Sequence, residues 1–338
     1  MTNGLGVAVV GATGAVGNEF LRLFDERSFP IGSLSLLASK RSVSRTLRFR
    51  GEDVPVLEAT PEAFEGVDVA FFSAGASRSR ELAPAALKAG ALVVDNSSAY
   101  RMAPDVPLVV PEVNLDAVLP EHRLIANPNC VAAILVMAVH PLRQLGKIER
   151  LIVSTYQSAS GGGAAMMQRL LEETRSSVDP SSEAPDPNMA YPPYAFNLFS
   201  HNTPINDLGY NEEEAKVVAE TQKILGDPSL KVNVTCIRVP VLRAHSESVT
   251  VEFDGPAPSE EAVRQVFRDF PGVRLVDDRA ANHFPTPLEA SGRDEVLVGR
   301  IRKDVSNPNA LCLFVVGDQL LKGAALNAVQ IAEALVRR

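Results

Sequence analysis

The first third of the chain alternates short apolar runs with helix-like runs. Two stretches, 15–26 and 79–89, show the spacing of helices that cover a sheet. The apolar runs predict strands at 5–10, 33–38, 67–73, 91–95, 107–110 and 123–126. Strands that are apolar on both faces and alternate with helices are typical of a parallel sheet covered on both sides. We therefore expect an α/β domain with a doubly wound, Rossmann-type parallel sheet.

After residue 130 the pattern changes to alternating apolar and polar residues, which is typical of a sheet with one buried face. We expect an α+β catalytic and dimerisation domain at 129–317, with a mixed or antiparallel sheet whose uncovered face is a candidate subunit contact. The amphipathic run 319–336 predicts a helix that returns to the first domain, so 1–128 and 318–338 form one unit. The pattern predicts strands at 151–157, 231–239, 246–253 and 296–302, and helices at 164–175, 212–225 and 259–269.

Composition narrows the class of protein. A length of 338 residues predicts roughly two domains. The net charge of −8 argues against partners such as nucleic acid or an anionic membrane. Three cysteines make no disulfide framework and indicate a reducing cytoplasm.

Other segments give weaker indications. The N-terminus lacks the pattern of a signal peptide, and no apolar run reaches the ~18 residues of a membrane span. No His, Cys and carboxylate cluster has the spacing of a metal site. The segment 179–193, rich in Pro, Ser and acidic residues, predicts an exposed insertion or a contact between lobes.

One thiol stands where a strand-like run gives way to a helix-like run. Asn127-Pro128-Asn129-Cys130 follows the apolar run 123–126 and precedes the apolar run 131–139. Unpaired N–H groups in the first turn of a helix carry partial positive charge, which favours a thiolate over a thiol. A thiolate there can attack a carbonyl carbon and form a thioester. The alternative interpretation is an inert cysteine of the core.

A glycine-rich loop follows the first strand. Gly11-Ala12-Thr13-Gly14-Ala15-Val16-Gly17 connects the strand 5–10 to the helix 15–26. Glycines permit the tight turn, and the helix N-terminus supplies N–H donors to a pyrophosphate. The G-x-x-G-x-x-G spacing only approximates the regular fingerprint, so a turn without a ligand is the alternative. The loop predicts dinucleotide binding.

The end of the second strand bears on the choice of dinucleotide. Ser39-Lys40-Arg41-Ser42 offers two cations and two hydroxyls where an NAD enzyme usually has a carboxylate for the ribose 2′-OH. Arg binds phosphate in a bidentate, charge-assisted way, so NADP is favoured over NAD. A solvated basic loop is the alternative. Ser73-Ala74-Gly75, at the end of another strand, is a candidate cofactor contact or a small-residue turn.

Cys130 needs a base, and five histidines are available. His245 stands out because Arg238 and Arg243 accompany it where one strand ends and another begins, although a lone histidine is more often structural. The sequence predicts surface, helix-end or loop positions for the other four histidines: His122, His140, His201 and His283.

The reaction also needs groups that orient and anchor a substrate. Gln157 precedes a triple glycine and is a candidate to orient a carbonyl, with a flexible turn as the alternative. Arg101 follows another strand end and is a candidate phosphate ligand. Glu213 and Lys216 are three apart on a predicted helix, the usual arrangement of a surface ion pair.

Taken together, these motifs make the chain resemble the aspartate-β-semialdehyde dehydrogenase family. The resemblance covers nearly the whole chain, in the order expected of the family. Each motif alone is modest, whereas their combination is specific. The matching motifs are residues 11–17, 97–101, 127–130, 155–158, 211–216, 238–245 and 317–325.

The resemblance implies a role for each matching residue. Cys130 is the nucleophile, His245 the general acid/base, and Gln157 orients the thioacyl intermediate. Arg238 binds the substrate α-carboxylate and Glu213 the α-amino group. The phosphate ligands are Arg101, Asn129 and Lys216. The residues facing NADP are Gly11, Thr13, Gly14, Ala15, Val16, Ser39, Arg41, Ser42 and Gln319. We add Ser73, Gly75, Ser160 and Gly161 as candidate cofactor contacts.

The resemblance further implies a reaction and an assembly. Cys130 attacks aspartyl phosphate, phosphate leaves, and the thioester accepts hydride from NADPH, giving aspartate semialdehyde. A histidine whose pKa lies near neutral serves in both directions. The implied protein is a cytoplasmic homodimer or dimer-based tetramer in lysine, threonine and methionine biosynthesis.

One departure keeps two alternatives open. The family commonly has a hydroxyl residue after the nucleophile, and this chain has Val131, so we expect an altered rate. A related acyl-phosphate reductase, such as N-acetyl-glutamyl-phosphate reductase, has no free α-amino group to bind, so Glu213 discriminates against it. A catalytically silent NADP-binding regulator is disfavoured by Cys130, Gln157 and His245.

Overall fold

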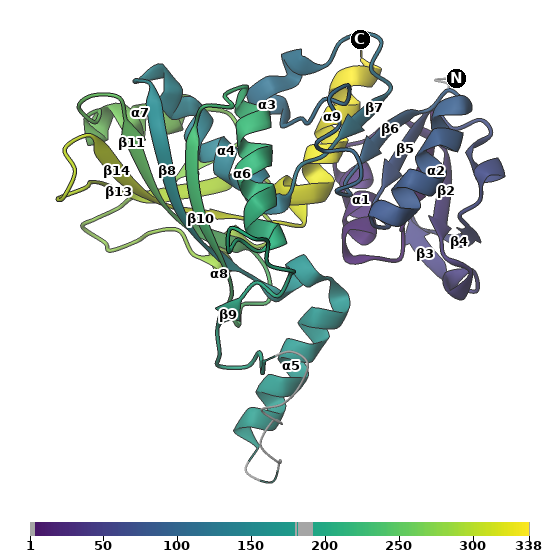
Figure 1. Cartoon of the computed structure of the whole chain (residues 1–338). Helices are drawn as coiled ribbons and strands as arrows, with labels where there is room; N and C mark the ends of the chain where they lie inside the picture. Colours follow the sequence, from purple (N-terminus) through teal and green to yellow (C-terminus); the bar gives the residue numbers. More distant parts are fainter. Residues whose placement is uncertain (1–3, 180, 182–191, 338) are drawn as a thin grey trace. The chain divides into compact units, whose positions relative to one another are not determined.

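A computed structural model describes residues 4–179, 181 and 192–337. Most of the segment 179–193, predicted to be an insertion, lies outside the described residues. The chain divides into two compact units (Figure 1). We call Met1–Asn129 with Gly323–Arg338 the N-terminal unit, and Cys130–Lys322 the central unit. The helix near the C-terminus therefore belongs to the first unit.

The N-terminal unit is built on one seven-stranded sheet with the order β3-β4-β2-β1-β5-β6-β7. All neighbouring strands are parallel except the edge pair β3–β4, which is antiparallel. The strands are β1 (Leu5–Val10), β2 (Ile31–Ala38), β3 (Thr46–Phe49), β4 (Glu52–Glu58), β5 (Val69–Phe72), β6 (Leu92–Asp95) and β7 (Leu124–Ala126).

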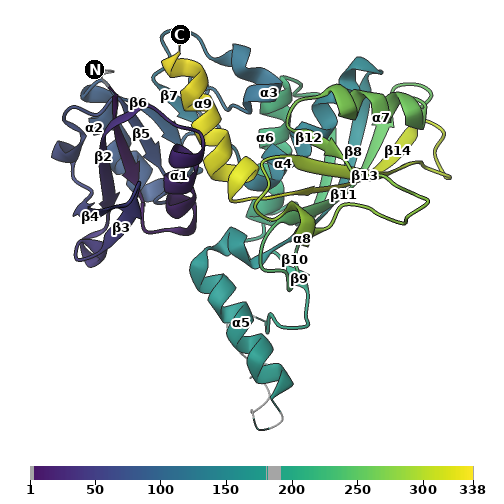
Figure 2. The same cartoon turned by 180° about the vertical axis from the view of Figure 1, so that it is seen from behind.

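Helices cover both faces of this sheet, as Figures 1 and 2 show from opposite sides. Phe72 points to one face, where it joins the core beneath α2 (Ala76–Lys88). The adjacent Phe71 points to the other face and packs on aromatic rings of α1 (Ala15–Glu26), which also contacts α9 (Leu326–Val336). Two buried faces explain the uninterrupted apolar strands. The predicted doubly wound sheet is confirmed.

Several local features of the N-terminal unit differ from what the sequence pattern predicts. The hairpin β3–β4 was not predicted, because its strands are mostly exposed and carry little apolar pattern. Residues 107–110 form no strand and make only the isolated bridge Leu108–Ala126. The last helix begins at Leu326 after a π-turn at Leu321–Ala325, and most of it is buried, so it is less amphipathic than expected.

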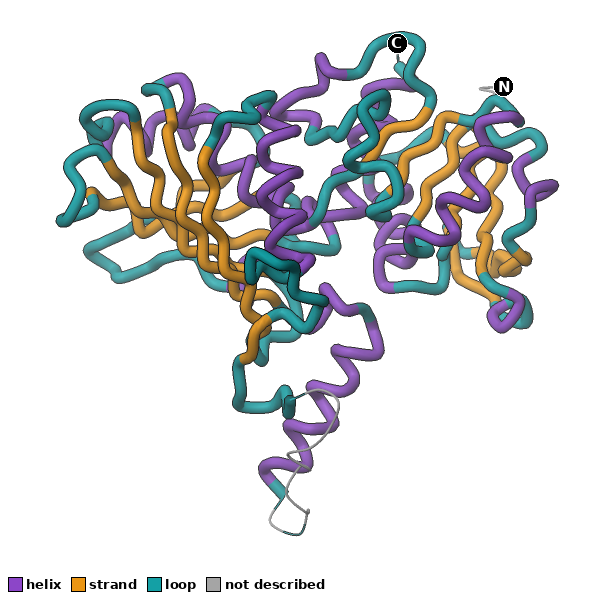
Figure 3. The backbone as a smooth tube through the Cα atoms, in the orientation of Figure 1, coloured by secondary structure: helices purple, strands orange, loops and turns teal. Residues whose placement is uncertain are grey.

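The central unit contains a mixed seven-stranded sheet with the order β12-β13-β14-β11-β8-β10-β9. Figure 3 distinguishes its strands in orange from the helices in purple. The pairs β8–β10 and β12–β13 are parallel, and the others are antiparallel. This confirms the α+β prediction. The strands are β8 (Ile148–Gln157), β9 (Phe199–Ser200), β10 (Lys231–Arg238), β11 (His245–Phe253), β12 (Val273–Leu275), β13 (Val296–Lys303) and β14 (Ala310–Gly317).

Two helices lie over the part of this sheet that carries the predicted site. α4 (Cys130–Val139) packs on β11, β13 and β14, and α6 (Glu212–Leu225) packs on β10 and on α4. Every residue of α4 after Cys130 is buried, which explains its wholly apolar sequence. The remaining helices are α3 (Pro111–Asn114) in the N-terminal unit, and α5 (Ala164–Val178), α7 (Glu260–Asp269) and α8 (Pro287–Ala290) in the central unit.

Candidate active site

Three predicted site residues form one row across the central sheet. Arg238 at the end of β10 pairs with Gln157 at the end of β8. His245 begins β11 one position before Ser246, which pairs with Tyr156, so His245 lies beside Gln157. On its other side His245 pairs with Gly317 of β14. Directly paired residues point to the same face of a sheet, so strand register alone brings these side chains together.

A hydrogen bond to a side chain of α6 fixes Gln157. Its amide Nε2 donates to Glu213 Oε1 at 3.0 Å, and both side chains are buried. Glu213 lies in the first turn of α6, whose start is fixed by the capping box of Asn211 and Glu214. The amide nitrogen of Gln157 keeps a second N–H for another acceptor. Lys216 makes its ion pair with Glu212, at 2.8 Å, and is a quarter exposed.

Arg238 is buried and fixed by two acceptors. Its Nη1 donates to the carbonyl oxygen of Ser158 at 3.2 Å, and its Nη2 lies 2.7 Å from His201 Nε2. A guanidinium only donates, so His201 Nε2 accepts and the ring is neutral. Burial, followed by the charge of Arg238, lowers the pKa of His201 to about 4. The sequence predicts only a loop position for His201, because nothing in it shows that this loop crosses the end of β10.

His245 is fully buried at the β11 end of the row. Its Nδ1 receives the backbone N–H of Ser158 at 3.0 Å and lies 3.0 Å from the hydroxyl of the same residue. Burial, then the charges of Arg238 and His201, lowers the pKa of His245 well below its ordinary value. We expected a pKa near neutral, so this is a correction. The physical reason is that burial removes the ring from solvent, which disfavours its charged form, and that the positive charge of Arg238 disfavours it further.

Gly161 leaves open the space beside these side chains. A Cβ at this position would lie 3.0 Å from His245 Cε1 and 3.1 Å from Arg238 Nη1. Any larger residue would therefore press on both groups at once. The sequence offers Gly161 as a candidate cofactor contact or as part of a flexible turn; in the structure its lack of a side chain also keeps this space open.

Cys130 is the first residue of α4, as the sequence predicts, and is partly exposed. Ile134, one turn along the same helix face, packs so closely on the sheet that a Cβ at Gly317 would lie 2.8 Å from its Cγ1. Because Gly317 pairs with His245, the helix face that carries Cys130 and Ile134 covers the row on the side to which His245 points. Val131 is completely buried.

The residues before Cys130 belong to the N-terminal unit and are fixed there. Arg101 Nε donates to the carbonyl oxygen of Asn127 at 2.9 Å, and its Nη2 to that of Asn96 at 2.7 Å. Asn327 of α9 donates to the Asn127 side chain at 2.7 Å. Arg101 and Asn129 are both buried. Arg101 thus supports the loop that leads to Cys130, in addition to the phosphate contact expected of it.

The glycine loop borders a cavity of about 390 Å³ in the N-terminal unit. Gly11 has φ +90°, and a Cβ there would lie 2.4 Å from the carbonyl oxygen of Ser73, so only glycine fits. Gly75 also has a positive φ and caps α2. One cation that we did not predict, Arg78, lines the cavity. Six of the predicted contacts also line it: Gly11, Thr13, Gly14, Ser39, Arg41 and Ser73. Ala15 and Val16 open α1, and Ser42 ends the 3-10 turn Lys40–Ser42.

Two residues expected to face the cofactor are buried and bonded within the central unit. The amide of Gln319 donates to the Ser160 hydroxyl, and its Oε1 accepts from the backbone N–H of Ala244 at 2.9 Å. Ser160 Oγ lies 3.1 Å from Ser158 Oγ. A chain of side chains therefore connects Gln319 to His245. The sequence gave no sign of it, because residues 160 and 319 are remote along the chain.

The other cysteines have different surroundings from Cys130. Cys236 is buried beneath α6, and burial raises the pKa of its thiol, while Cys312 is partly exposed. No disulfide joins the three cysteines. Within the described residues, no group of three His, Cys, Asp or Glu side chains is arranged to hold a metal. Among the helices described, none is long and apolar enough to cross a membrane.

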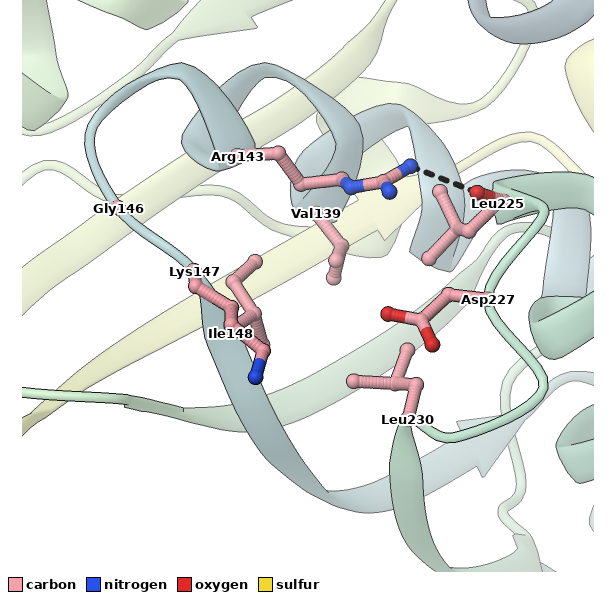
Figure 4. A pocket seen from close by; sticks show the side chains of 8 residues that line it. All are labelled: Val139, Arg143, Gly146, Lys147, Ile148, Leu225, Asp227 and Leu230. Atoms are coloured by element: carbon pink, nitrogen blue, oxygen red, sulfur yellow. Dashed lines mark hydrogen bonds between the residues drawn. The ribbon is translucent and has the colours of Figure 1, made fainter.

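A separate cavity of about 240 Å³ opens in the central unit near the end of α6 (Figure 4). Arg143 Nη1 crosses it to donate to the carbonyl oxygen of Leu225 at 2.7 Å. None of the predicted site residues lines it. Its lining is Val139, Arg143, Gly146, Lys147, Ile148, Leu225, Asp227 and Leu230.

Two family models match the chain in the same order as its two units. Residues 6–119 match the semialdehyde dehydrogenase NAD binding domain, and residues 139–322 the semialdehyde dehydrogenase dimerisation domain. The fold and the site therefore define a two-domain semialdehyde dehydrogenase.

Known proteins narrow this class. The aspartate-semialdehyde dehydrogenase of Synechocystis sp. is 50% identical over 338 residues, covering 100% of this chain and 99% of the relative. The crystal structure of Vibrio cholerae aspartate semialdehyde dehydrogenase II complexed with ASA has a TM-score of 0.93 at 42% identity, covering 99% of both chains. The Candida albicans aspartate semialdehyde dehydrogenase with NADP has a TM-score of 0.76 at 26% identity, covering 98% of both. The chain belongs to the aspartate-semialdehyde dehydrogenase family.

Proposed function

We propose that this protein is an NADP-dependent aspartate-semialdehyde dehydrogenase, which converts L-4-aspartyl phosphate to L-aspartate 4-semialdehyde with release of phosphate. The observation that carries the proposal is the row of Arg238, Gln157 and His245 beneath the helix that begins at Cys130. The names of the relatives give the substrate class. The pathway that this product serves would be lysine, threonine and methionine biosynthesis.

Cys130 is the nucleophile of the proposed reaction. Its thiolate attacks the carbonyl carbon of aspartyl phosphate and becomes a thioester as phosphate leaves. The first turn of α4 favours the thiolate through its unpaired N–H groups. Neither of the other two thiols combines this position with an adjacent row of polar side chains.

Each polar residue of the site binds a different group of the proposed substrate. The buried Arg238 binds the α-carboxylate in a bidentate way, and Glu213 binds the α-amino group. Gln157, whose orientation Glu213 fixes, donates its second N–H to the thioacyl oxygen. The departing phosphate binds to cationic and amide groups, which stabilise its charge: Arg101, Asn129 and Lys216.

The N-terminal unit fits a phosphorylated dinucleotide. Gly11 allows the backbone to approach a pyrophosphate, and Ser39 and Arg41 line the same cavity where a ribose 2′-phosphate would be recognised. NADPH, when bound, supplies the hydride. The matching family model is described as an NAD binding domain, whereas the Candida albicans structure contains NADP. The proposed preference for the 2′-phosphate therefore depends on Arg41.

We also propose a cytoplasmic homodimer or homotetramer. The sheet face opposite the row carries Tyr156, which is 38% exposed and lies 6.4 Å from the Phe314 ring between centroids. The same face carries small polar side chains, such as Ser154, Ser248 and Thr250, that are only partly buried, so this mixed face is open to contact with a second copy. The description of the matching model as a dimerisation domain supports this assignment.

A phosphate-dependent assay tests the proposal. The protein is incubated with aspartate semialdehyde and phosphate, with NADP or NAD, and the formation of reduced cofactor is recorded. We expect turnover that requires phosphate and prefers NADP. Turnover only with N-acetyl-glutamate semialdehyde would indicate the related reductase. Tight NADPH binding without turnover on either substrate would indicate a regulator.

A further inference from the structure

Two residues proposed to bind the amino-acid end of the substrate belong to different elements. Arg238 ends β10, and Glu213 lies in the first turn of α6. The loop between β9 and α6 is attached to both elements. At its start, the backbone N–H of His201 donates to the carbonyl oxygen of Cys236 on β10 at 2.9 Å. At its end, the side chain of Asn211 caps α6. The loop therefore connects the strand that carries Arg238 with the helix that carries Glu213.

The ring of His201 links Arg238 to Thr203. A guanidinium only donates, so its Nη2 gives a hydrogen bond to His201 Nε2, 2.7 Å away. The single proton of the neutral ring is then on Nδ1, which lies 3.4 Å from Thr203 Oγ1 and donates to it. His201 is buried and Thr203 is half-buried. The positive charge of Arg238 therefore determines which way each bond of this link points.

The hydroxyl of Thr203 continues the link to α6. Its Oγ1 accepts the backbone N–H of Glu213 at 3.3 Å, one of the first-turn N–H groups that have no acceptor within the helix. A hydroxyl oxygen has two lone pairs, so Thr203 accepts from His201 and from Glu213 together. One oxygen atom thus connects the ring that orients Arg238 with the backbone of Glu213.

One end of this link supplies a cation and the other a carboxyl group. Arg238 donates to Ser158 and His201, and its Nε is buried with no partner among the described residues. Glu213, which is also buried, accepts from Gln157 through Oε1. A ligand whose carboxylate pairs with Arg238 and whose ammonium pairs with Glu213 satisfies both buried groups. A ligand without the ammonium offers Glu213 no opposite charge, which a site of this kind penalises strongly.

We propose that His201 and Thr203 are positioning residues, which hold Arg238 and Glu213 at the separation that fits a carboxylate and an ammonium on one carbon atom. The inference rests on the proposed function and adds the residues that make the site selective for a free α-amino acid derivative. Both residues act through other groups, on the end of the substrate that does not react. Their loss should therefore change KM for the amino-acid substrate more than kcat.

A matched pair of variants tests the hydroxyl of Thr203. Thr203→Val removes the acceptor at nearly the same size, whereas Thr203→Ser keeps it. A separate bond from the N–H of Cys236 to Glu214 Oε1, at 3.0 Å, still holds α6 on β10 in both. We expect KM for aspartate semialdehyde to rise at least about tenfold in the Val variant, with little change in kcat or in KM for NADP, and the Ser variant to restore it.

The control for this pair is Asn202→Ala, at the exposed residue between His201 and Thr203, which should behave as the wild-type protein does. An unchanged KM in Thr203→Val, or equal losses in the Val and Ser variants, would overturn the proposal.

Variants of His201 give a second test that does not depend on the folding of the Thr203 variants. His201→Gln offers an oxygen to Arg238 and an amide N–H to Thr203, so its KM for aspartate semialdehyde should stay near the wild-type value. His201→Leu offers neither, and its KM should rise at least about tenfold. Thermal melting of each variant checks that it folds. Equal KM values in the Gln and Leu variants would show that the link is not needed.

Selectivity is measured with succinate semialdehyde, which has the same carbon skeleton without the α-amino group. The wild-type protein should prefer aspartate semialdehyde in kcat/KM, and Thr203→Val should lower this preference at least about tenfold. Wild-type turnover of aspartate semialdehyde with an unchanged preference in Thr203→Val would refute this inference alone. No wild-type turnover of aspartate semialdehyde would refute the proposed function, and this inference with it.

Discussion

Arg238 Nη2 lies 2.7 Å from Nε2 of His201, so a buried cation is fixed by a neutral histidine. A carboxylate in the place of His201 would neutralise Arg238 and compete with an anionic ligand. A neutral acceptor orients the guanidinium while its positive charge stays available. This arrangement suits the carboxylate-binding role that we propose for Arg238.

This pair predicts a pH dependence of stability. The pKa of His201 is about 4 in the folded protein and about 6.5 in the unfolded chain. As the pH falls from about 6.5 to about 4, only the unfolded chain takes up this proton, so stability is lost by up to roughly 1.4 kcal/mol per pH unit. His201→Gln keeps an acceptor for Arg238 but does not titrate.

Urea unfolding of both proteins between pH 4.5 and 7.5 checks this prediction. We expect the difference in free energy of unfolding to move in favour of the Gln variant as the pH falls. His245, whose folded pKa is also lowered, is present in both proteins and cancels. Two parallel curves would contradict the assignment of a neutral His201.

Gly161→Ala should impair catalysis more than folding. The added Cβ would press on His245 Cε1 at 3.0 Å and on Arg238 Nη1 at 3.1 Å, so both groups must shift. We expect kcat/KM to fall by at least about tenfold, because small displacements of positioned groups are costly. The matched control is Gly162→Ala, whose Cβ would meet the flexible side chain of Met166. Equal losses in both variants would show that the space beside His245 is unimportant.

Arg41→Glu should change cofactor preference. It places a carboxylate in the cavity where we propose that the 2′-phosphate binds, so KM for NADPH should rise by more than about tenfold and KM for NADH far less. Lys40→Glu makes the same charge change at a neighbour that does not line the cavity. A similar rise for both cofactors in Arg41→Glu would remove this residue from 2′-phosphate recognition.

Cys130→Ser should keep NADP binding and lose turnover. The hydroxyl has nearly the size of the thiol but is far less ionised, so kcat should fall by at least about 10³-fold. Steady-state assays and fluorescence titration with NADPH measure the two properties separately. Cys312→Ser serves as the control, because Cys312 lies on β14 outside the row. Substantial remaining activity in Cys130→Ser would exclude this thiol as nucleophile.

The spacing of apolar residues predicts most helices and strands of this fold, because the buried face of each element determines that spacing directly. Helices α1 and α6 have the predicted bounds, since each has one buried face and a clear start. The strand β14 was missed, because its apolar run continues into the predicted helix at 319. Edge strands such as β9 have two residues and no pattern to recognise.

The site is predictable only in part. Motifs that the family shares identify Cys130, Gln157, Arg238 and His245 without any structure. Ser158 acts through its backbone N–H, which every residue except proline possesses, so no residue type reveals it. His201 reaches Arg238 from a loop 37 residues away in the sequence. Contacts of this kind follow from strand register and loop path, which one sequence does not specify.

Covalent acylation of Cys130 is the step on which the proposed reaction depends, and mass spectrometry of the protein detects it. The protein is incubated with aspartate semialdehyde and NADP without phosphate, quenched in acid and digested. We predict that the peptide containing Cys130 gains the mass of the semialdehyde less two hydrogens, and that this gain disappears when phosphate is added before quenching. An adduct on Cys236 or Cys312, or turnover with no acylated cysteine even under rapid quenching, would contradict it.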